Sequence, residues 1–268
     1  MKIRGVDVQP VIIVGHGRSG TIHLAEMLHL HPDVYATIEQ PRPLFRLLNE
    51  SLFNPTERHA IPNIFEAKKQ WLRHNKTWMG KTKPRVWVEK SNAMVLVQDL
   101  VEKTWPEAYI LHIIRNPFDV YCSSLTHPGL MSWLKRASEV MGLGDNSFLG
   151  TTAKMNPWYE NAPTPVKLAY KWKSWVEHGL KWQRESDKVL TLTYRDMTRR
   201  TAKTFNTIQN FIGLEKNQAW LEDITGRTHS KSVDRYKTDM PLSKRVLMNA
   251  VLYGFLESHD VLKKFRLR

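Results

Sequence analysis

Short apolar runs and longer segments with one apolar face alternate along this chain. Fully apolar runs predict buried strands, because the strands of a parallel sheet are covered on both sides. The predicted strands are Val11–Val14, Arg85–Lys90, Ala108–Arg115 and Lys188–Tyr194, with a short extended segment at Asp33–Pro41. Ala108–Arg115 reads as a continuous apolar run.

The intervening segments repeat their apolar residues at helical spacing. These predicted helices are Thr21–His29, Asn63–His74, Ala93–Trp105, a helix that starts after Asn116, Pro165–Arg184 and a helix from Thr201 that stops at Gly213. Strands that alternate with helices predict the α/β class, a mostly parallel central sheet with helices on both faces. Glycine and methionine gather in residues 128–157, which we expect to be an irregular excursion or lid.

The chain has 268 residues, of which 41% are hydrophobic, and no linker, repeat or apolar stretch of membrane-spanning length. We therefore expect a single domain over residues 1–268 without a transmembrane segment. The single cysteine, Cys122, and an N-terminus without a signal-like apolar core favour the cytoplasm. The net charge of +14 favours an anionic ligand, but Lys and Arg are spread along the chain without a dense basic tail.

The most informative stretch is "VIIVGHGRSGTIHLAEML" at residues 11–28, an apolar run, three glycines within six positions and a helical segment. This order predicts a strand, a tight loop and a helix. The loop is then a P-loop-like phosphate-binding loop after the first strand. Such a loop directs backbone N–H groups and a helix N-terminus at an anion, most often a phosphate. In a parallel sheet the ligand lies at the carboxyl ends of the strands.

Three interpretations of this loop compete. Gly15-x-Gly17-x-x-Gly20 with Glu39 matches a NAD-binding oxidoreductase, although Pro41 and Pro43 stand where a strand should lead into a helix. The Walker loop of a nucleotide-dependent kinase also has this glycine spacing. Its lysine and magnesium-ligand positions, however, are occupied here by Thr21 and Ile22, so metal-dependent phosphoryl transfer is badly equipped.

In the third interpretation the loop holds phosphate-like oxygens without a metal. Arg18, Ser19 and Thr21 supply donors, and the helix dipole begins at Gly20. A sulfuryl group on a phosphate carries less charge than a triphosphate, so arginine and backbone donors can stabilise its transfer without Mg²⁺.

Three ordered motifs resemble the sulfotransferases that use 3′-phosphoadenosine-5′-phosphosulfate (PAPS) and release adenosine 3′,5′-bisphosphate. "VIIVGHGRSGT" resembles their 5′-phosphosulfate loop, and "YILHIIRNPFDVYCSS" their 3′-phosphate motif. "VLTLTYRDM" resembles a further family strand, and the resemblance runs from about Val11 to Leu214. It implies a sulfotransferase that transfers a sulfuryl group to a hydroxyl or amine of an unidentified acceptor.

The resemblance also implies which residues bind the cofactor. They are Gly17, Arg18, Ser19, Gly20, Thr21 and Ile22 in the loop, Arg115 and Ser123 at the 3′-phosphate, and Tyr194 near the nucleotide. The Arg-Lys-Gly run of the cytosolic members is absent, and Lys231 and Arg235 are its candidate substitutes. Two further departures are Ile22, where many members carry a second threonine, and Arg195, where the tyrosine motif has glutamate.

The base that deprotonates the acceptor must be chosen without the histidine of the cytosolic members, because Ser91, Asn92 and Ala93 follow Lys90. The chain more closely resembles bacterial and carbohydrate sulfotransferases, which have a glutamate at the place of Glu39, after the helix that follows the loop. We expect Glu39 to be the general base, Arg18 to act on the sulfuryl group and Lys90 to act at the leaving or acceptor oxygen. The alternatives are a solvated or Arg42-paired Glu39 and a surface Lys90.

No metal is expected, because one cysteine and histidines six positions apart at His23 and His29 give no ligand set. His112, inside an apolar strand, is expected in the core. The predicted partner is a small-molecule, glycan or lipid acceptor and not a nucleic acid. A basic nucleic-acid-binding module is the non-enzyme alternative, but it leaves the Arg115 and Ser123 motif unexplained.

Overall fold

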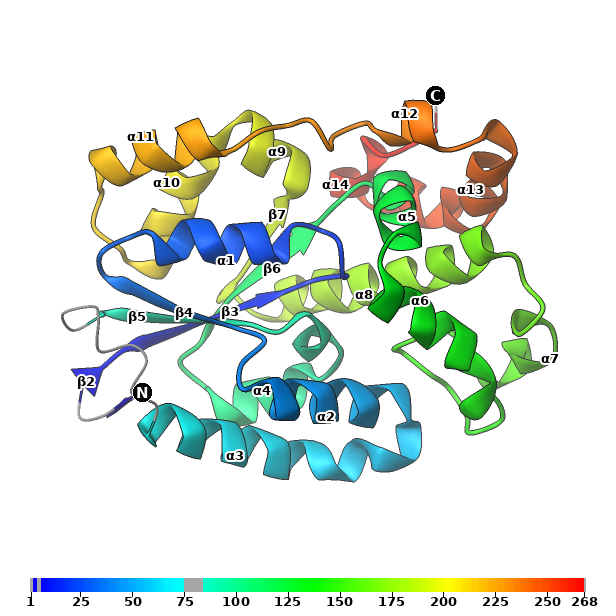
Figure 1. The fold of residues 1–268 in the computed structure, drawn as a ribbon, viewed down its shortest axis with the longest axis horizontal. Helices are drawn as coiled ribbons and strands as arrows, with labels where there is room; N and C mark the ends of the chain where they lie inside the picture. The colour runs from blue at the N-terminus through cyan, green and yellow to red at the C-terminus, as the bar shows by residue number, and fades with distance from the viewer. Residues whose placement is uncertain (1, 4–5, 75–83, 268) are drawn as a thin grey trace.

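A five-stranded parallel sheet forms the centre of the protein (Figure 1), in a computed structural model that describes residues 2–3, 6–74 and 84–267. The strand order is β4-β5-β3-β6-β7, and all four strand pairings are parallel. The strands are β3 (Gln9–Val14), β4 (Val34–Ile38), β5 (Val86–Lys90), β6 (Tyr109–Ile114) and β7 (Val189–Thr193). A separate antiparallel pair, β1 (Lys2–Ile3) and β2 (Val6–Asp7), precedes them.

The first strand of the sheet, β3, is also its middle strand. The chain leaves β3 toward β4 and β5 on one side and later returns to β6 and β7 on the other. The order of connections therefore reverses at the carboxyl end of β3, where α/β proteins form their ligand crevice. The glycine loop of residues 15–20 lies at this point.

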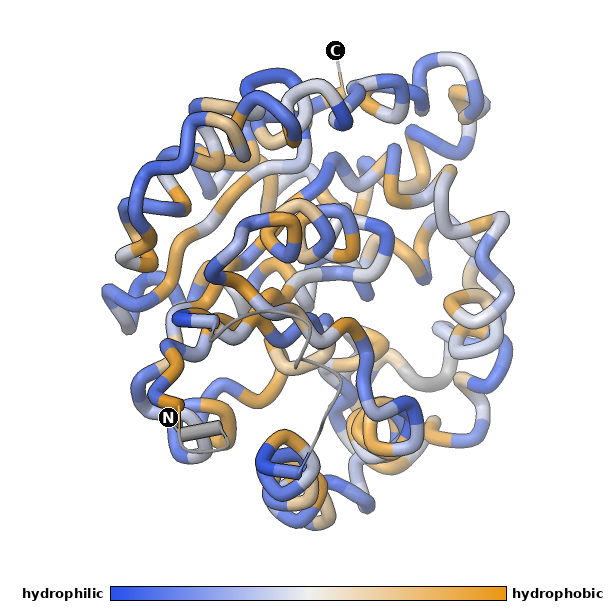
Figure 2. Tube along the Cα trace, turned by 60° about the vertical axis from the view of Figure 1, so that its left-hand side comes forward, coloured by the Kyte–Doolittle hydropathy of each residue, from blue (hydrophilic) through white to orange (hydrophobic). Residues whose placement is uncertain are grey.

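Side chains of β3 alternate between two separate cores, one on each face of the sheet. Val11 and Ile13 pack with α1 (Thr21–His29), α10 (Thr201–Ile212) and α11 (Gln218–Arg227). Ile12 and Val14 pack on the opposite face. The helices of that face include α2 (Arg42–Phe53), α3 (Ile61–His74), α4 (Gln98–Thr104), α8 (Thr164–Glu185) and α13 (Leu242–Glu257). The hydropathy colouring of Figure 2 shows apolar strands inside and polar positions on the outer sides of the helices.

Two further groups of helices border the carboxyl edge of the sheet. They are α5 (Pro117–Leu125), α6 (Pro128–Lys135) and α7 (Asn156–Tyr159), then α9 (Tyr194–Arg199), α12 (Tyr236–Asp239) and α14 (Asp260–Lys263). The predicted N-cap of α5 is confirmed, because the Asn116 side chain accepts the Phe118 N–H. None of the described helices is long and apolar enough to cross a membrane.

Two local predictions are wrong. Residues 93–105 do not form one helix but a 3-10 segment, Asn92–Leu96, followed by α4. All side chains from Ala93 to Val97 are buried, and an α-helix with one apolar face does not bury five consecutive residues. Residues 128–157 are not irregular throughout, because α6 begins where the His127 side chain accepts the Leu130 N–H and Pro128 takes the first helical position.

The sequence prediction also missed helices α2, α11 and α13 and extended the last strand by one residue at each end. Pro41 and Pro43 do not only end the extended segment, since Pro43 lies in the first turn of α2. Tyr194 belongs to α9, because the Thr193 side chain accepts the Asp196 N–H and starts the helix there.

Candidate active site

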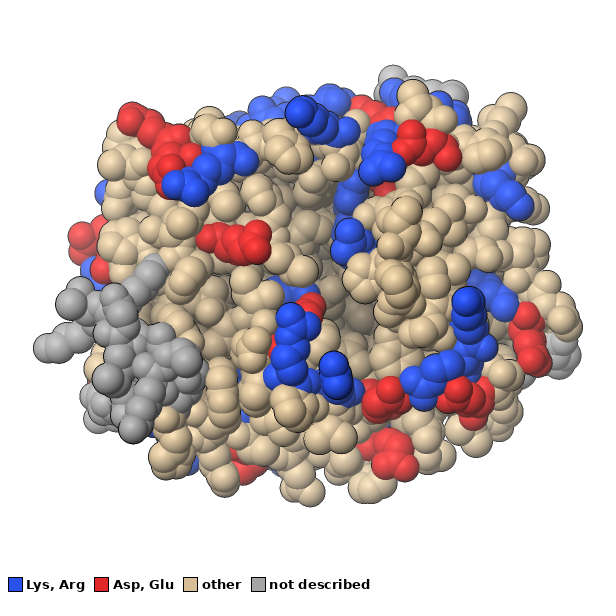
Figure 3. All heavy atoms as spheres, viewed as in Figure 1, with Lys and Arg blue, Asp and Glu red and all other residues tan. Residues whose placement is uncertain are grey.

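A cleft of about 790 Å³ opens at the carboxyl edge of the sheet. Figure 3 shows this face hollowed at its centre, with Lys and Arg side chains along the border of the hollow. Each of the five parallel strands delivers residues to the cleft at its carboxyl end. They are Gly17, Arg18 and Gly20 after β3, Glu39 after β4, Lys90 and Asn92 at the end of β5, Arg115 after β6 and Tyr194 after β7.

The backbone of the loop requires glycine at two positions. At Gly15 the φ angle is 142°, and a Cβ would lie 2.5 Å from the carbonyl oxygen of Ile113. At Gly20 the φ angle is 93°, and a Cβ would lie 2.4 Å from a ring carbon of Tyr194. Arg18 adopts a left-handed backbone conformation with φ 69°. This conformation is energetically unfavourable for any residue other than glycine. The loop is therefore a tight and specific structure.

The N-terminus of α1 is free to bind an anion. Its N-cap is Gly20, no side chain caps it, and its first turn contains no acidic residue. The first N–H groups of a helix have no partner inside the helix, and they carry the positive end of its dipole. Thr21 is buried at this end, whereas Ile22 is 41% exposed. Both residues line the cleft.

Arg115 ties three segments of the site together. One terminal nitrogen donates to the carbonyl of Arg18 at 2.9 Å, and the other donates to the carbonyl of Ser232 at 2.7 Å. The guanidinium lies 4.5 Å from the centre of the Tyr194 ring. Burial lowers the pKa of Arg115, although it remains a cation at neutral pH. The arginine therefore both builds the cleft and lends it positive charge.

The other predicted cofactor residues are distributed unevenly. Ser123 lines the cleft, but its hydroxyl accepts a hydrogen bond from the Arg18 Nε at 3.0 Å. Arg235 also lines the cleft and pairs with Asp239. Lys231 is exposed and is not among the lining residues; its neighbour Ser232 takes that place. The structure thus brings Arg18, Ser123 and Arg115 together, whereas Lys231 stays outside.

Glu39 and Lys90 form an ion pair on the floor of the cleft, with Lys90 Nζ on Glu39 Oε1. Arg42 approaches the other carboxylate oxygen at 3.3 Å. The Lys90 side chain is 1% exposed and that of Glu39 17% exposed. Burial lowers the pKa of Lys90, while the Glu39 carboxylate favours its charged form. Glu39 itself is held at a positive φ of 55°.

A second, buried ion pair lies directly behind the first. Lys68 of α3 contacts Glu89 at 2.7 Å, and these side chains are 5% and 4% exposed. Lys68 also donates to the carbonyl of Gln40, the residue after Glu39, and Thr37 donates to Glu89. Burial raises the pKa of Glu89. The pair connects α3, β4 and β5 at the segment that presents Glu39.

Several buried polar atoms around the loop have no hydrogen-bond partner among the residues that the structure describes. They are Ser19 Oγ, Arg115 Nε, Asn92 Oδ1, Ser91 Oγ and His16 Nε2. Buried polar atoms are normally paired, so a cluster of unpaired ones indicates a ligand or ordered water. The hydroxyl and the guanidinium nitrogen can both donate to an anion. The residues present therefore fit a group that carries phosphate.

The prediction from the sequence missed some residues of the cleft. Asn92, Lys171, Trp175 and Ser232 line it, and the sequence prediction named none of them as a site residue. The sequence offers one signal for Lys171, because this lysine stands on a face of α8 that is otherwise mainly apolar. A lysine in such a position is expected to be buried and to have a specific role. Trp175 is buried, and one side of it also borders the cleft.

Two buried histidines are neutral. Burial lowers the pKa of His16 and of His112 to about 3 in each case. The prediction that His112 belongs to the core is confirmed, and its Nδ1 lies 3.2 Å from the Thr191 hydroxyl. Among residues 2–3, 6–74 and 84–267, no three His, Cys, Asp or Glu side chains are grouped as a metal site.

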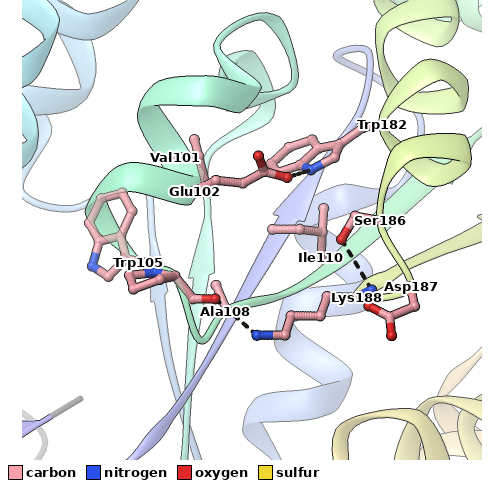
Figure 4. A pocket seen from close by; sticks show the side chains of 10 residues that line it. Val101, Glu102, Trp105, Ala108, Ile110, Trp182, Ser186, Asp187 and Lys188 are labelled. Atoms are coloured by element: carbon pink, nitrogen blue, oxygen red, sulfur yellow. Dashed lines mark hydrogen bonds between the residues drawn. The ribbon is translucent and has the colours of Figure 1, made fainter.

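A second, smaller pocket of about 250 Å³ lies at the opposite edge of the sheet, beside the start of β6 and β7 (Figure 4). Two of its polar groups are paired: the Trp182 indole donates to Glu102 at 2.7 Å, and Lys188 Nζ donates to the carbonyl of Pro106 at 3.0 Å. The indole N–H of Trp105 is buried without a partner in the described residues, but a single neutral donor makes no anion site. This pocket presents none of the unpaired donors that border the large cleft.

The fold and the cleft define an α/β protein with a P-loop-like anion site at the switch point of its sheet. The comparison of sequences makes this class specific, because the model described as "Sulfotransferase family" matches residues 10–218. The chain belongs to the sulfotransferase family, and the enzyme class is that of a sulfotransferase. No curated protein sequence matches the chain.

Solved structures of sulfotransferases share the fold. STF9 from Mycobacterium avium is 14% identical with a TM-score of 0.58 and covers 94% of this chain and 77% of its own. Mouse SULT7A1, complexed with PAP, is 15% identical with a TM-score of 0.56, and the match covers 98% of this chain and 90% of the mouse chain. A sulfotransferase from Alicyclobacillus acidocaldarius is 17% identical with a TM-score of 0.54, covering 98% of each chain.

Proposed function

We propose that the protein transfers a sulfuryl group from PAPS to a hydroxyl or amine of an acceptor molecule. The observation that carries this proposal is the uncapped N-terminus of α1 beside the unpaired donors of Ser19 and Arg115, in a chain of the sulfotransferase family. PAPS supplies the activated sulfuryl group, and the PAP bound to the mouse neighbour supports this donor. The acceptor is a small molecule, a glycan or a lipid.

The loop residues and the arginine would hold the donor. In this proposal, backbone N–H groups of Gly17, Gly20 and Thr21 and the Ser19 hydroxyl bind the 5′-phosphosulfate oxygens. Arg115 and Ser123 bind the 3′-phosphate, with Arg18 between them on the Ser123 hydroxyl. Ile22 has an exposed apolar side chain, so only its backbone N–H can donate to the cofactor.

Tyr194 and Arg235 line the same half of the cleft and complete the proposed nucleotide site. Ser232, rather than Lys231, is the residue of that segment that borders the cleft, so we assign Lys231 at most a long-range electrostatic effect on the anion. Arg18 stays the candidate for the sulfuryl oxygens, since it lines the cleft from within the loop.

Glu39 is the proposed general base. A Glu39 oxygen would take the proton from the hydroxyl or amine of the acceptor. The oxygen or nitrogen of that acceptor group then forms the new bond to sulfur, while the bond between sulfur and the leaving phosphate oxygen breaks. Lys90 holds the carboxylate in place through their ion pair, so that one oxygen keeps a fixed position on the floor of the cleft. Its position beside Glu39 also places a cation where negative charge develops on the leaving or acceptor oxygen.

The two other interpretations of the loop are not favoured. A kinase would require a lysine and a hydroxyl at the positions of Thr21 and Ile22. A NAD-binding oxidoreductase would use Glu39 for a ribose, but its carboxylate is paired with Lys90 and Arg42. Metal-independent transfer remains part of the proposal, as does a cytoplasmic location, which rests on the single Cys122.

Donor binding is tested by calorimetric titration of the metal-free protein with adenosine 3′,5′-bisphosphate, with ADP, ATP–Mg²⁺ and NAD for comparison. We expect micromolar binding of the bisphosphate and at least tenfold weaker binding in Arg115→Ala, since one charge-assisted hydrogen bond contributes about 1.5–3 kcal/mol. Arg227→Ala, which removes an exposed arginine paired with Asp223, is the matched control. Tight binding of ATP–Mg²⁺ or NAD without the bisphosphate would overturn the proposal.

The base is tested in Glu39→Gln with any acceptor that shows turnover. We expect kcat to fall by about 10²–10⁴ with an unchanged bisphosphate Kd, because general base catalysis contributes about that factor. Glu26→Gln removes another carboxylate that lines the cleft and has no ion pair in the described part of the chain, so it is the control. Equal kcat in Glu39→Gln and the wild type would exclude Glu39 as the base.

A further inference from the structure

The half of the cleft away from the nucleotide residues has a floor of aromatic rings. Phe53, Trp133, Phe148 and Trp175 form a continuous row, with successive ring centres 4.9, 5.1 and 5.4 Å apart. The last three line the cleft, together with Phe45 and Leu130 from α2 and α6. Aromatic faces bind rings and the apolar faces of sugars. This half of the cleft, which we call the acceptor compartment, therefore suits a ring-containing molecule.

Lys171 places a cation at the edge of this floor. Its Nζ donates to the carbonyl of Phe148 at 2.6 Å and lies 3.5 Å from the centre of the Phe148 ring and 4.5 Å from that of Trp175. The residue is 2% exposed and has no carboxylate partner in residues 6–74 and 84–267. An ammonium has three N–H donors, and the described part of the chain provides an acceptor for one of them. A buried cation without a counterion is costly.

Arg46 provides a second cation in the lining of the cleft. It lies on α2, lines the cleft and is exposed, and its side chain makes no ion pair or hydrogen bond within the described ranges of the chain. The acids of the compartment are, in contrast, already neutralised. Glu39 is paired with Lys90, and both oxygens of Glu50 accept from Arg136 at 2.9 and 3.1 Å. The compartment thus offers positive charge without an internal partner.

We propose that the acceptor is an anion: a ring-containing molecule that carries a carboxylate, sulfate or phosphate besides the group that receives the sulfuryl. Its ring packs on Trp133 and Phe148, and its anionic group pairs with Lys171 and Arg46. The proposal rests on the proposed function and names the substrate class of that site. The donor does not account for these cations, because its own phosphates are assigned to the loop and to Arg115.

The lowered pKa of Lys171 supports this assignment. Burial lowers that pKa well below its ordinary value, and His16, the titratable group beside it, is neutral at physiological pH. Burial alone therefore disfavours the charged form of this amine. A bound carboxylate favours the ammonium again, because opposite charges at short distance stabilise the charged form.

The test is calorimetric and uses two matched pairs of ligands on the protein saturated with adenosine 3′,5′-bisphosphate. The pairs are phenyl β-D-glucuronide with phenyl β-D-glucoside, and 4-hydroxyphenylacetate with 4-hydroxyphenylacetamide. We expect the anion of at least one pair to bind tenfold or more tightly than its neutral partner. Lys171→Met keeps the packing volume and should reduce this preference to less than threefold. Lys173→Met, on the same helix and outside the cleft, should leave it unchanged.

Arg46→Gln repeats the test at an exposed position, so it decides the question if Lys171→Met does not fold. Equal binding of anion and neutral partner in both pairs, no binding of either anion at 10 mM, or an undiminished preference in the foldable variants would overturn this inference. These results leave the proposed function intact if the bisphosphate binds. Loss of bisphosphate binding in the wild type would instead overturn the proposed function, and the inference with it.

Discussion

The buried pair of Lys68 and Glu89 gives the sharpest prediction about stability. The two side chains are 5% and 4% exposed and their charged atoms are 2.7 Å apart, so water solvates neither charge and each depends on the other for its stabilisation. Removal of one partner leaves the other charge buried and unpaired, which costs about 3–5 kcal/mol. We therefore expect Lys68→Met and Glu89→Leu each to lower the free energy of unfolding by about that amount, a large part of the 5–15 kcal/mol typical of a domain.

The double variant Lys68→Met/Glu89→Leu removes both charges and replaces them with apolar side chains. Replacement of a whole buried pair is often neutral or stabilising by about 1–4 kcal/mol, because no charge then needs desolvation. We expect the double variant to be at least about 2 kcal/mol more stable than either single variant. Its turnover should nevertheless be lower than that of the wild type. The reason is that Lys68 no longer donates to the carbonyl of Gln40, a contact that helps to position Glu39.

The assay is urea unfolding followed by tryptophan fluorescence, with the m-value checked for two-state behaviour. The control is Glu215→Gln, which breaks an exposed pair with Arg85 of nearly the same length, 2.8 Å, and should cost less than about 1 kcal/mol. If the two single effects add up in the double variant within about 0.5 kcal/mol, the charges are not coupled and the reasoning is refuted.

Three further predictions concern packing and pH. Gly20→Ala drives a Cβ into the Tyr194 ring at a φ of 93°, so we expect a loss of about 1–3 kcal/mol and weaker bisphosphate binding by calorimetry. Gly179→Ala places a Cβ 2.2 Å from the His112 ring and should cost a similar amount in urea unfolding, whereas Gly226→Ala, which meets open space, should not destabilise. The pKa of His112 is about 3 in the native state and 6.5 when unfolded, so the unfolded state binds the extra proton and stability falls as the pH drops below 6.5. Between pH 7.5 and 5 this residue should cost about 2 kcal/mol, and His112→Leu should lose that much less over the same range.

The sequence determined the elements whose signals are local. The apolar runs of β3, β5 and β6, the glycine loop before α1 and the Asn116 cap of α5 were all predicted, because each depends on a few neighbouring residues. Predictions failed where the burial of whole segments overrides periodicity, as in Ala93–Val97, and where a proline starts a helix instead of ending a segment, as at the first turn of α2.

Only the tertiary structure decided which charges meet. Glu39 and Lys90 are 51 residues apart and become partners because β4 pairs in parallel with β5, in a register that sets Ile38 opposite Lys90. Lys171 reaches the cleft because α8 packs its buried face beneath the edge of the sheet. Strand order and register arise from the burial of two cores at once, a property of the whole chain that no short stretch of sequence contains.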